Sequence, residues 1–364
     1  MSGLKAVVVG DAMIMGDAFE ASAKKYLGNK FSDIKMGNWE DDYPKLQDRR
    51  LKVEQQGPEI EVVPEIVLKE GKDASFLSGL FVPVSSKLMD AMPNLKIVGV
   101  ARAGLENVNV AEATKRGILV FNIEGRNAHA VSDFTVGLML CECRNMARAH
   151  YSIKNGEWRK KFVNSEWVPE LKDKNVGLIG FGYIGRLVAQ KLSGFGVNLM
   201  VYDPFVNEAA VKEAGGRVVD KETLFKEADF ISLHARMSAE TKGLVGEKEL
   251  SLMKPTAYLI NTARAGLIDE AALLKALKNK QIAGAGLDVF NSEPLEPNSA
   301  FLELDNVTLT THIAGTTREA LTRSPDILME DVKTLFDGGS PRFIINKEVL
   351  DNPSFKSWLE GVRS

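Results

Sequence analysis

A glycine-rich turn between a buried strand and a helix constrains the fold of this chain more than any other segment. In NVGLIGFGYIGRLVAQKL (175–192), the glycines Gly180, Gly182 and Gly185 have G-x-G-x-x-G spacing. An apolar run precedes them, a helical pattern follows, and Asp203 closes the next strand 18 residues beyond Gly185. The three glycines permit a tight turn, a close approach of the backbone to a pyrophosphate, and close packing of helix on strand. This context predicts a dinucleotide-binding unit, and a glycine-rich turn without a ligand is the alternative.

Two stretches of alternating strand and helix patterns divide the chain. The first begins with the apolar run at 4–10 and continues to about residue 123, and the second begins near residue 174 with six strand patterns. Such alternation predicts an α/β fold with two doubly wound parallel-sheet domains. Residues 127–156 have helical spacing and predict one long linking helix, and residues 318–339 predict a helix that returns to the first domain. The predicted domains are 1–124 with 317–350, and 125–316, followed by an unassigned tail, 351–364, that contains Trp358.

The composition limits the classes of partner. A formal net charge of -3 over 364 residues gives no electrostatic reason to bind nucleic acid or an anionic membrane. No apolar run reaches the roughly 18 residues of a membrane-spanning helix, and the first residues lead into a strand pattern rather than a signal peptide. Cys141 and Cys143 point to different faces of a helix, which favours reduced thiols over a disulfide or a metal pair. We therefore expect a cytoplasmic protein that needs no metal.

Chemically active side chains follow three predicted strands of the second domain. Arg264 lies in LINTARAGLID, Asp288 and Glu293 lie in AGLDVFNSEPL, and His312 lies in TTHIAGTT. In a doubly wound sheet, the carboxyl ends of the strands face the ligand crevice. A histidine can exchange a proton near neutral pH, a carboxylate can orient it, and the planar fork of an arginine suits a substrate carboxylate. Each residue could instead be an ordinary loop or surface residue, but successive strand ends favour one catalytic site.

The acidic residue after the glycine-rich turn bears on the choice of cofactor. Asp203 lies in VYDPF, where its carboxylate is expected to accept hydrogen bonds from the adenosine ribose hydroxyls. The same charge would repel a 2′-phosphate, and no arginine follows it. NAD is therefore favoured over NADP.

Four segments resemble the D-isomer-specific 2-hydroxyacid dehydrogenases, the family of phosphoglycerate, glycerate and D-lactate dehydrogenases. They are GFGYIGRLVAQKLSGFG (180–196), LINTARAGLIDEAALLKAL (259–277), GAGLDVFNSEPL (284–295) and THIAGTT (311–317), and the similarity extends over roughly residues 60 to 345. The resemblance implies a Rossmann NAD-binding domain inserted into a flavodoxin-like substrate domain. It also implies a homodimer that transfers a hydride between NAD and C2 of a small 2-hydroxy or 2-keto acid.

The resemblance further implies residue roles. His312 would be the acid/base, Glu293 would hold it, Arg264 would bind the substrate carboxylate and carbonyl, and Asp288 would contact the nicotinamide amide. Residues 100–117 resemble the substrate loop, whose backbone amides hold the carboxylate. The implied substrate contacts are Arg102, Ala103, Gly104, Arg264 and His312. The expected cofactor contacts are Gly180, Gly182, Tyr183, Ile184, Gly185, Asp203, His234, Thr262, Ala263, Arg264, Asp288, His312 and Gly315.

Several positions depart from the family pattern. Ala265 stands where a glycine is frequent, and Thr311 and Arg236 stand where prolines are common. Arg102 and Ala103 differ from the phosphoglycerate-type loop, which disfavours phosphoglycerate itself as substrate. Arg102, Arg236 and the N-terminal loop at 10–19 are expected to shape the far end of the substrate site, and these polar positions suggest a sugar acid or its phosphate.

Two other functions are compatible with parts of this pattern. An NAD-sensing corepressor shares the fold and resembles the catalytic triad, although the chain has no long disordered tail or basic region for transcriptional partners. A formate dehydrogenase is less compatible, since the formate enzymes of the family replace the glutamate that Glu293 represents. The remaining histidines, His129 and His150, are expected to be structural or exposed.

Overall fold

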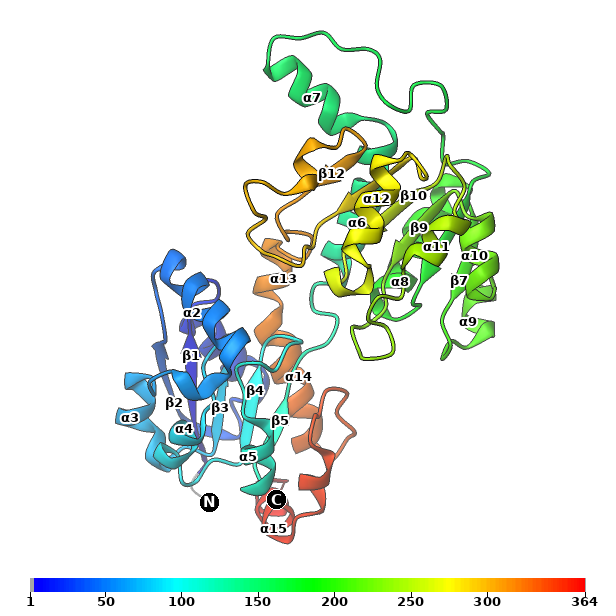
Figure 1. Cartoon of the computed structure of the whole chain (residues 1–364). Coiled ribbons are helices and arrows are strands. Elements are labelled where there is room, and N and C mark those ends of the chain that lie inside the picture. Colours follow the sequence, from blue (N-terminus) through cyan, green and yellow to red (C-terminus); the bar gives the residue numbers. More distant parts are fainter. Residues whose placement is uncertain (1–2, 364) are drawn as a thin grey trace. The chain divides into compact units, whose positions relative to one another are not determined.

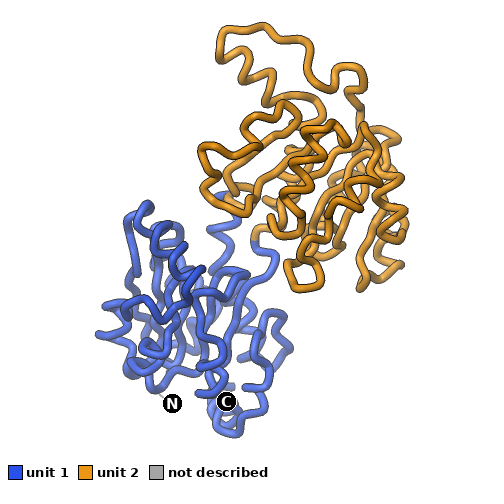
Figure 2. Tube along the Cα trace, viewed as in Figure 1, with its two compact units in different colours: residues 1–126, 317–364 blue, residues 127–316 orange. Residues whose placement is uncertain are grey.

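The computed structural model describes residues 3–363, which form two compact units (Figures 1 and 2). Unit 1 contains the described residues through Arg126 and those from Thr317 onward, and unit 2 contains Asn127–Thr316. Unit 2 is thus an insertion in unit 1, and the chain passes between them two residues after the predicted position, 124. No helix in residues 3–363 is long and apolar enough to cross a membrane.

The sheet of unit 1 has five parallel strands in the order β2-β1-β3-β4-β5. This is the strand order of flavodoxin-like doubly wound folds. The edge strand β2 was not predicted, because most of its residues are partly exposed and its apolar pattern is weak. The strands are β1 (Leu4–Gly10), β2 (Phe31–Asn38), β3 (Phe76–Gly79), β4 (Ile97–Val100) and β5 (Leu119–Phe121).

One hydrophobic core joins the sheet of unit 1 to its helices. It includes the C-terminal tail, where Phe355 and Leu359 are buried and Trp358 packs its ring against Phe336 and Phe355. The tail is therefore part of unit 1 rather than a separate segment. The α-helices of unit 1 are α1 (Gly16–Leu27), α2 (Tyr43–Gln56), α3 (Glu65–Glu70), α4 (Ser86–Ala91), α5 (Val110–Lys115), α13 (Arg318–Thr322), α14 (Ser324–Phe336) and α15 (Pro353–Arg363).

The sheet of unit 2 has seven parallel strands in the order β12-β11-β10-β9-β6-β7-β8. Numbered within the unit, this is the Rossmann order 3-2-1-4-5-6 with one more strand at the end. In this numbering β8 is strand 3, and the strand beyond the Rossmann six is β12. Six strands were expected, and the one that was not predicted is the short, largely exposed β8. The strands are β6 (Asn175–Ile179), β7 (Asn198–Tyr202), β8 (Gly216–Val218), β9 (Phe230–Leu233), β10 (Tyr258–Asn261), β11 (Gly284–Leu287) and β12 (Val307–Leu309).

Alternate residues of the central strands enter two separate cores in unit 2. On β10, Tyr258 and Ile260 belong to the core that contains helices α6 and α8, whereas Leu259 belongs to the core on the other face. Burial on both faces explains the continuous apolar runs of these strands, and it confirms the predicted fold of two doubly wound domains. The helices of unit 2 are α6 (Ala128–Cys143), α7 (Met146–Lys154), α8 (Tyr183–Leu192), α9 (Glu208–Glu213), α10 (Lys221–Glu227), α11 (Glu247–Leu252) and α12 (Glu270–Lys278).

The prediction of one long helix over residues 127–156 was wrong. The chain forms α6 and α7, and Asn145 between them has a φ of 56°, a left-handed conformation that ends a helix. A second predicted helix, over 318–339, is likewise two helices, α13 and α14, and Pro325 lies in the first turn of α14.

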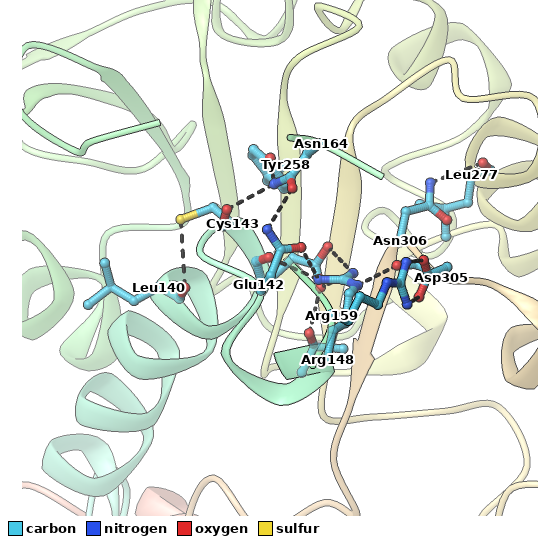
Figure 3. A network of polar contacts seen from close by, with 12 residues as sticks. Leu140, Glu142, Cys143, Arg148, Arg159, Asn164, Tyr258, Leu277, Asp305 and Asn306 are labelled. Atoms are coloured by element: carbon cyan, nitrogen blue, oxygen red, sulfur yellow. Dashed lines mark hydrogen bonds and ion pairs between the residues drawn. The ribbon is translucent and has the colours of Figure 1, made fainter. Parts of the chain in front are cut away.

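A buried polar network holds the α6–α7 turn against the sheet (Figure 3). Both carboxylate oxygens of Glu142 accept hydrogen bonds from Arg148 Nη2, at 2.7 and 2.9 Å, and one also accepts from Thr308 Oγ1 on β12 at 2.5 Å. Asn164 donates to the Tyr258 hydroxyl and to the carbonyl oxygen of Cys143, at 2.7 and 2.9 Å. These contacts join the turn to two strands of the sheet.

Removing one charge of this network should destabilise the protein strongly. In Glu142→Gln, the buried guanidinium of Arg148 keeps its charge and loses its counter-ion, which costs roughly 3 kcal/mol or more. Urea unfolding measures the loss in the free energy of unfolding. Glu65→Gln is the matched control, since Glu65 forms an exposed ion pair with Lys69, and such pairs contribute at most about 1 kcal/mol. Equal stabilities of the two variants would contradict the role of the network.

Candidate active site

The predicted site residues of unit 2 lie directly beyond the carboxyl ends of its parallel strands. Because all seven strands run in the same direction, these ends share one edge of the sheet. Gly180 follows β6, Asp203 follows β7, His234 follows β9, Arg264 follows β10, Asp288 follows β11 and His312 follows β12.

The glycine-rich turn fits a pyrophosphate. Gly180 has a φ of +96°, and a Cβ there would lie 2.7 Å from the carbonyl carbon of His234. Gly182 caps α8 without a side-chain hydrogen bond, and a Cβ at Gly182 would meet nothing within 4 Å. The absence of a side chain at Gly182 therefore leaves room for a ligand beside the first turn of α8, and a helix N-terminus suits an anion.

The Asp203 carboxylate also stabilises the glycine-rich turn through hydrogen bonds. Its Oδ2 accepts a hydrogen bond from the Phe181 N–H at 2.8 Å, and its Oδ1 accepts from the Phe205 N–H at 2.9 Å. Each oxygen keeps a second lone pair, so the partly exposed carboxylate can still accept hydrogen bonds from ribose hydroxyls. The bond to Phe181 was not predicted from the sequence.

The ring of His234 lies beside the glycine-rich turn with one nitrogen unpartnered. Its Nε2 is 3.0 Å from Ser232 Oγ, whereas its Nδ1 is buried and has no hydrogen-bond partner among the described residues. Burial lowers the pKa of His234 to about 4, so the ring is neutral at physiological pH. An orphaned polar atom at this edge is consistent with a ligand contact.

His312 and Glu293 are brought together, as the sequence predicted. His312 Nδ1 lies 2.7 Å from Glu293 Oε2, and Glu293 Oε1 accepts a hydrogen bond from the Phe290 N–H at 2.9 Å. The His312 side chain is 50% exposed, so its Nε2 remains accessible. The backbone of His312 has a φ of 55°, an uncommon left-handed conformation for a residue other than glycine.

The carboxylate of Asp288 anchors the loop that contains His312, residues 310–314. Its carboxylate is fully buried; Oδ1 accepts hydrogen bonds from Thr310 Oγ1 and the Ile313 N–H, at 2.7 and 3.0 Å, and Oδ2 accepts from the Ala314 N–H at 2.9 Å. The loop therefore closes around an acidic side chain that ends the neighbouring strand. These contacts assign Asp288 a supporting role that the sequence did not predict, while its contact with a nicotinamide amide stays a prediction.

Arg264 lies on a turn that is shaped by Asn261. The Asn261 side chain donates to the Arg264 carbonyl oxygen at 2.9 Å and accepts from the Ala263 N–H at 3.0 Å. The exposed guanidinium of Arg264 donates to the Ala263 carbonyl oxygen at 2.8 Å. No hydrogen bond or ion pair between described residues joins Arg264 to His312 or Glu293. The guanidinium therefore has donors left for a substrate.

The side chains of the other predicted cofactor contacts differ in their solvent exposure and in whether they already form hydrogen bonds. Tyr183 is exposed and Ile184 is partly exposed, in the first turn of α8. Thr262 is buried, and its hydroxyl lies 2.7 Å from that of Thr135 on α6, so its side chain is already used in packing. The side-chain amide nitrogen of Asn127 lies so close to Gly315 that a Cβ at this position would clash with it.

The predicted substrate contacts Arg102, Ala103 and Gly104 follow β4 in unit 1, within the predicted substrate loop at 100–117. The main-chain N–H groups of these three residues donate to no other described residue, so they are free to bind an anion. The Arg102 carbonyl oxygen accepts from the Ile123 N–H at 3.0 Å, and the Ala103 carbonyl oxygen accepts from the Asn122 side chain at 2.9 Å. These bonds fix the loop against the segment that follows β5.

No group of three or more histidine, cysteine, aspartate or glutamate side chains within residues 3–363 is arranged to hold a metal ion. Cys141 and Cys143 are free thiols, and burial raises the pKa of Cys143 to about 12. The groups at the carboxyl edge of unit 2 instead suit a dinucleotide, an anionic substrate and a proton transfer.

Comparisons with known proteins agree with this geometry. Residues 136–314 match the NAD-binding domain of the D-isomer specific 2-hydroxyacid dehydrogenases. The glyoxylate reductase of Thermococcus litoralis is 41% identical over 273 residues, which are 73% of this chain and 82% of that protein. The D-3-phosphoglycerate dehydrogenase of Archaeoglobus fulgidus is 37% identical over 274 residues, which are 75% of this chain and 51% of that longer protein.

Solved structures show the same likeness. An NAD-complexed D-isomer specific 2-hydroxyacid dehydrogenase from Lactobacillus delbrueckii has a TM-score of 0.73 and 26% identity, with 93% of this chain and all of that chain covered. The D-lactate dehydrogenase of Aquifex aeolicus, complexed with NAD and lactic acid, has a TM-score of 0.65 and 27% identity, with 94% of this chain and 97% of that chain covered. The predicted family and the NAD cofactor are thus confirmed. The chain belongs to the D-isomer-specific 2-hydroxyacid dehydrogenase family, and its unit 2 carries the NAD-binding domain of that family.

Proposed function

We propose that this protein is an NAD-dependent dehydrogenase that transfers a hydride to or from C2 of a small 2-hydroxy or 2-keto acid. The observation that carries the proposal is the 2.7 Å contact between His312 Nδ1 and Glu293 Oε2 at the carboxyl edge of an NAD-binding sheet. A proton exchanger oriented by a carboxylate is what oxidation of a hydroxyl group requires. A relative named glyoxylate reductase and another named D-3-phosphoglycerate dehydrogenase support the same substrate class.

His312 carries the proton. The Glu293 carboxylate accepts the Nδ1 proton, and this leaves Nε2 to give a proton to the carbonyl oxygen in reduction or to take the hydroxyl proton in oxidation. The Phe290 N–H fixes the other carboxylate oxygen, so Glu293 has one orientation toward the ring. The bound nicotinamide supplies or accepts the hydride.

Arg264 clamps the substrate. Its planar guanidinium can donate two parallel hydrogen bonds to the C1 carboxylate and can polarise the neighbouring C2 oxygen. The main-chain N–H groups of Arg102, Ala103 and Gly104 in unit 1 are further proposed contacts of a substrate carboxylate.

The cofactor contacts follow the glycine-rich turn and the strand ends. Gly180, Gly182 and Gly185 would hold the pyrophosphate at the start of α8, and Asp203 would bind the adenosine ribose. The further proposed contacts are Tyr183, Ile184, His234, Thr262, Ala263, Asp288 and Gly315.

The proposed substrate is a sugar acid or its phosphate. The polar positions Arg102 and Arg236 and the N-terminal loop at 10–19 support a substrate that extends beyond C2 with polar groups. We further place the enzyme in the cytoplasm, where its two free thiols would stay reduced.

Loss of His312 should abolish most turnover while NADH binding persists. His312→Ala removes the proton exchanger, which costs about a hundredfold or more in kcat. Glu293→Gln should lower turnover in both directions, because an amide nitrogen would then face Nδ1 and favour the wrong tautomer.

Turnover is followed with a panel of 2-keto acids at the nicotinamide absorbance, and NADH binding is followed by titration. His150→Ala is the matched control, since His150 is an exposed histidine on α7, and it should retain full turnover. Full turnover in His312→Ala would reject the assignment. NADH binding with no turnover of any 2-keto acid by the unmutated protein would favour the NAD-sensing corepressor instead.

The Asp203 charge should make the enzyme prefer NADH over NADPH. Asp203→Asn keeps an acceptor for the Phe181 N–H but removes the charge that repels a 2′-phosphate, so the preference should narrow by on the order of tenfold. The ratio of kcat/KM for the two cofactors measures it. Equal efficiency with both cofactors in the unmutated enzyme would refute the prediction.

A second copy of the chain is proposed to cover the apolar side chains of α7 and the arm after it. Tyr151 is 72% exposed and Trp158 is 77% exposed, and Met146, Ile153 and Val168 are also exposed. Light scattering at micromolar concentration should give the mass of two 39.9 kDa chains. Tyr151→Glu combined with Ile153→Glu should give monomers, while Phe205→Ser, at an exposed aromatic residue outside this segment, should not. A monomer mass for the unmutated chain would reject the dimer.

A further inference from the structure

Three arginines gather at the carboxyl edge of the unit 1 sheet, apart from the residues used above for hydride and proton transfer. Arg102 follows β4, Arg126 follows β5, and Arg50 extends from α2. Strands β4 and β5 are neighbours, and the segments beyond them are joined by the Ile123 N–H bond to Arg102. Ligands of open parallel sheets bind at this edge.

Two of these guanidinium groups share an aromatic ring and a carboxylate. The guanidinium carbons of Arg102 and Arg50 lie 4.7 and 5.4 Å from the centroid of the Phe81 ring. Glu54 Oε1 lies 2.9 Å from Arg102 Nη2 and 3.5 Å from Arg50 Nε. Glu106 Oε2 adds a third contact, 3.1 Å from Arg102 Nη2. Two like charges are thus held side by side over one ring.

The nearby buried acid does not pair with these arginines. Asp11 follows β1, and its carboxylate accepts hydrogen bonds from the main-chain N–H groups of Met13, Ile14 and Phe81, at 2.9, 3.1 and 3.2 Å. Burial raises the pKa of Asp11 to about 6, although these hydrogen bonds and Arg102 act in the opposite direction. No ion pair between described residues joins Asp11 to an arginine. The carboxylate accepts a hydrogen bond from the Phe81 N–H, and its charge acts on Arg102 and Arg126 without an ion pair to either.

Arg126 has no ion-pair partner among the described residues. Its Nη1 reaches only the Ala320 carbonyl oxygen and Ser324 Oγ, at 3.5 and 3.4 Å, the outer limit of a hydrogen bond. Burial, followed by the charges of Arg102 and Arg50, lowers the pKa of Arg126 to about 10, although the charge of Asp11 acts in the opposite direction. A half-buried cation beside two others is unfavourable unless an anion offsets the repulsion.

We propose that Arg126, together with Arg102 and Arg50, binds a second anionic group of the substrate, a phosphate ester or a far carboxylate. Three planar forks offer the parallel donors that both groups accept. The identity of the ligand as a substrate rests on the proposed 2-keto acid chemistry, whereas the anion site itself does not. Glyoxylate and other acids with a single carboxylate lack the group that this site binds.

Binding of simple anions tests the site without turnover. Isothermal titration in the absence of NADH measures the affinity for inorganic phosphate and for succinate, and the difference between them distinguishes a phosphate site from a carboxylate site. Arg126→Gln should weaken the preferred anion about tenfold or more, and Arg126→Lys should weaken it less, because it keeps the charge and loses the fork. Arg116→Gln is the matched control, since Arg116 pairs with Asp90 and Glu112 at the amino end of β5, and it should bind normally. Unchanged affinity in Arg126→Gln, or no binding of either anion to the unmutated protein, would overturn the proposal.

Steady-state kinetics with substrates that differ in the far group tests whether Arg126 determines substrate specificity. The kcat/KM of hydroxypyruvate, which ends in an uncharged hydroxyl, is compared with those of its phosphate ester and of 2-ketoglutarate. Arg126→Gln should lower kcat/KM for the preferred anionic substrate by on the order of thirtyfold relative to hydroxypyruvate. Arg264→Lys should lower kcat/KM for all three, because each carries the C1 carboxylate.

The two proposals fail in different ways. An equal loss of kcat/KM for all three substrates in Arg126→Gln would overturn the role of Arg126 in specificity. Turnover by the unmutated enzyme would still support its proposed function as a dehydrogenase. If no 2-keto acid were reduced, the dehydrogenase proposal would fail, and the anion titration would still decide whether Arg126 forms a site.

Discussion

The parallel direction of the strands is the constraint on which both candidate sites depend. A parallel sheet brings the carboxyl ends of all its strands to one edge, so residues far apart in the chain meet there without any long-range sequence signal. In unit 2, this edge collects the glycine-rich turn, Asp203, Arg264 and His312. In unit 1, the same constraint collects Asp11, the Arg102 loop and Arg126. The chemistry of each unit is therefore concentrated in the residues that immediately follow a strand.

Buried carboxylates give these edges their fixed shapes. Asp288 holds the His312 loop through three hydrogen bonds, and Asp11 holds its own turn and Phe81 in the same way. A loop built around such a group has little freedom, because a movement that broke these hydrogen bonds while the carboxylate stayed buried would leave a desolvated group without partners. His312 can therefore occupy a left-handed backbone conformation and still present its ring to Glu293. Glu142 has a similar function at the α6–α7 turn, away from the chemistry.

The elements with strong local patterns were predictable, and those that depend on neighbours were not. The buried strands and the G-x-G-x-x-G turn have apolar runs and spacing that only one fold satisfies. The edge strands β2 and β8 were missed because partly exposed residues carry little periodicity, and pairing with β1 or β7 makes them strands. The break at Asn145 was missed because helical spacing continues through it. It is stabilised by a distant partner, Asn164, which accepts a hydrogen bond from the Asn145 side chain at 2.6 Å.

The sequence by itself determined the fold class, the family resemblance, the cofactor, and the pairing of His312 with Glu293 as an expectation, because each depends on short motifs at strand ends. Tertiary structure alone decided what surrounds those motifs. It placed Asp288 against the His312 loop, and it gave Asp203 a second role in stabilising the glycine-rich turn. It also placed Arg126 near Arg102 and Arg50 with no ion-pair partner among residues 3–363. Electrostatic environments of this kind depend on distances between residues from different strands and helices, and no local pattern in a single sequence encodes those distances.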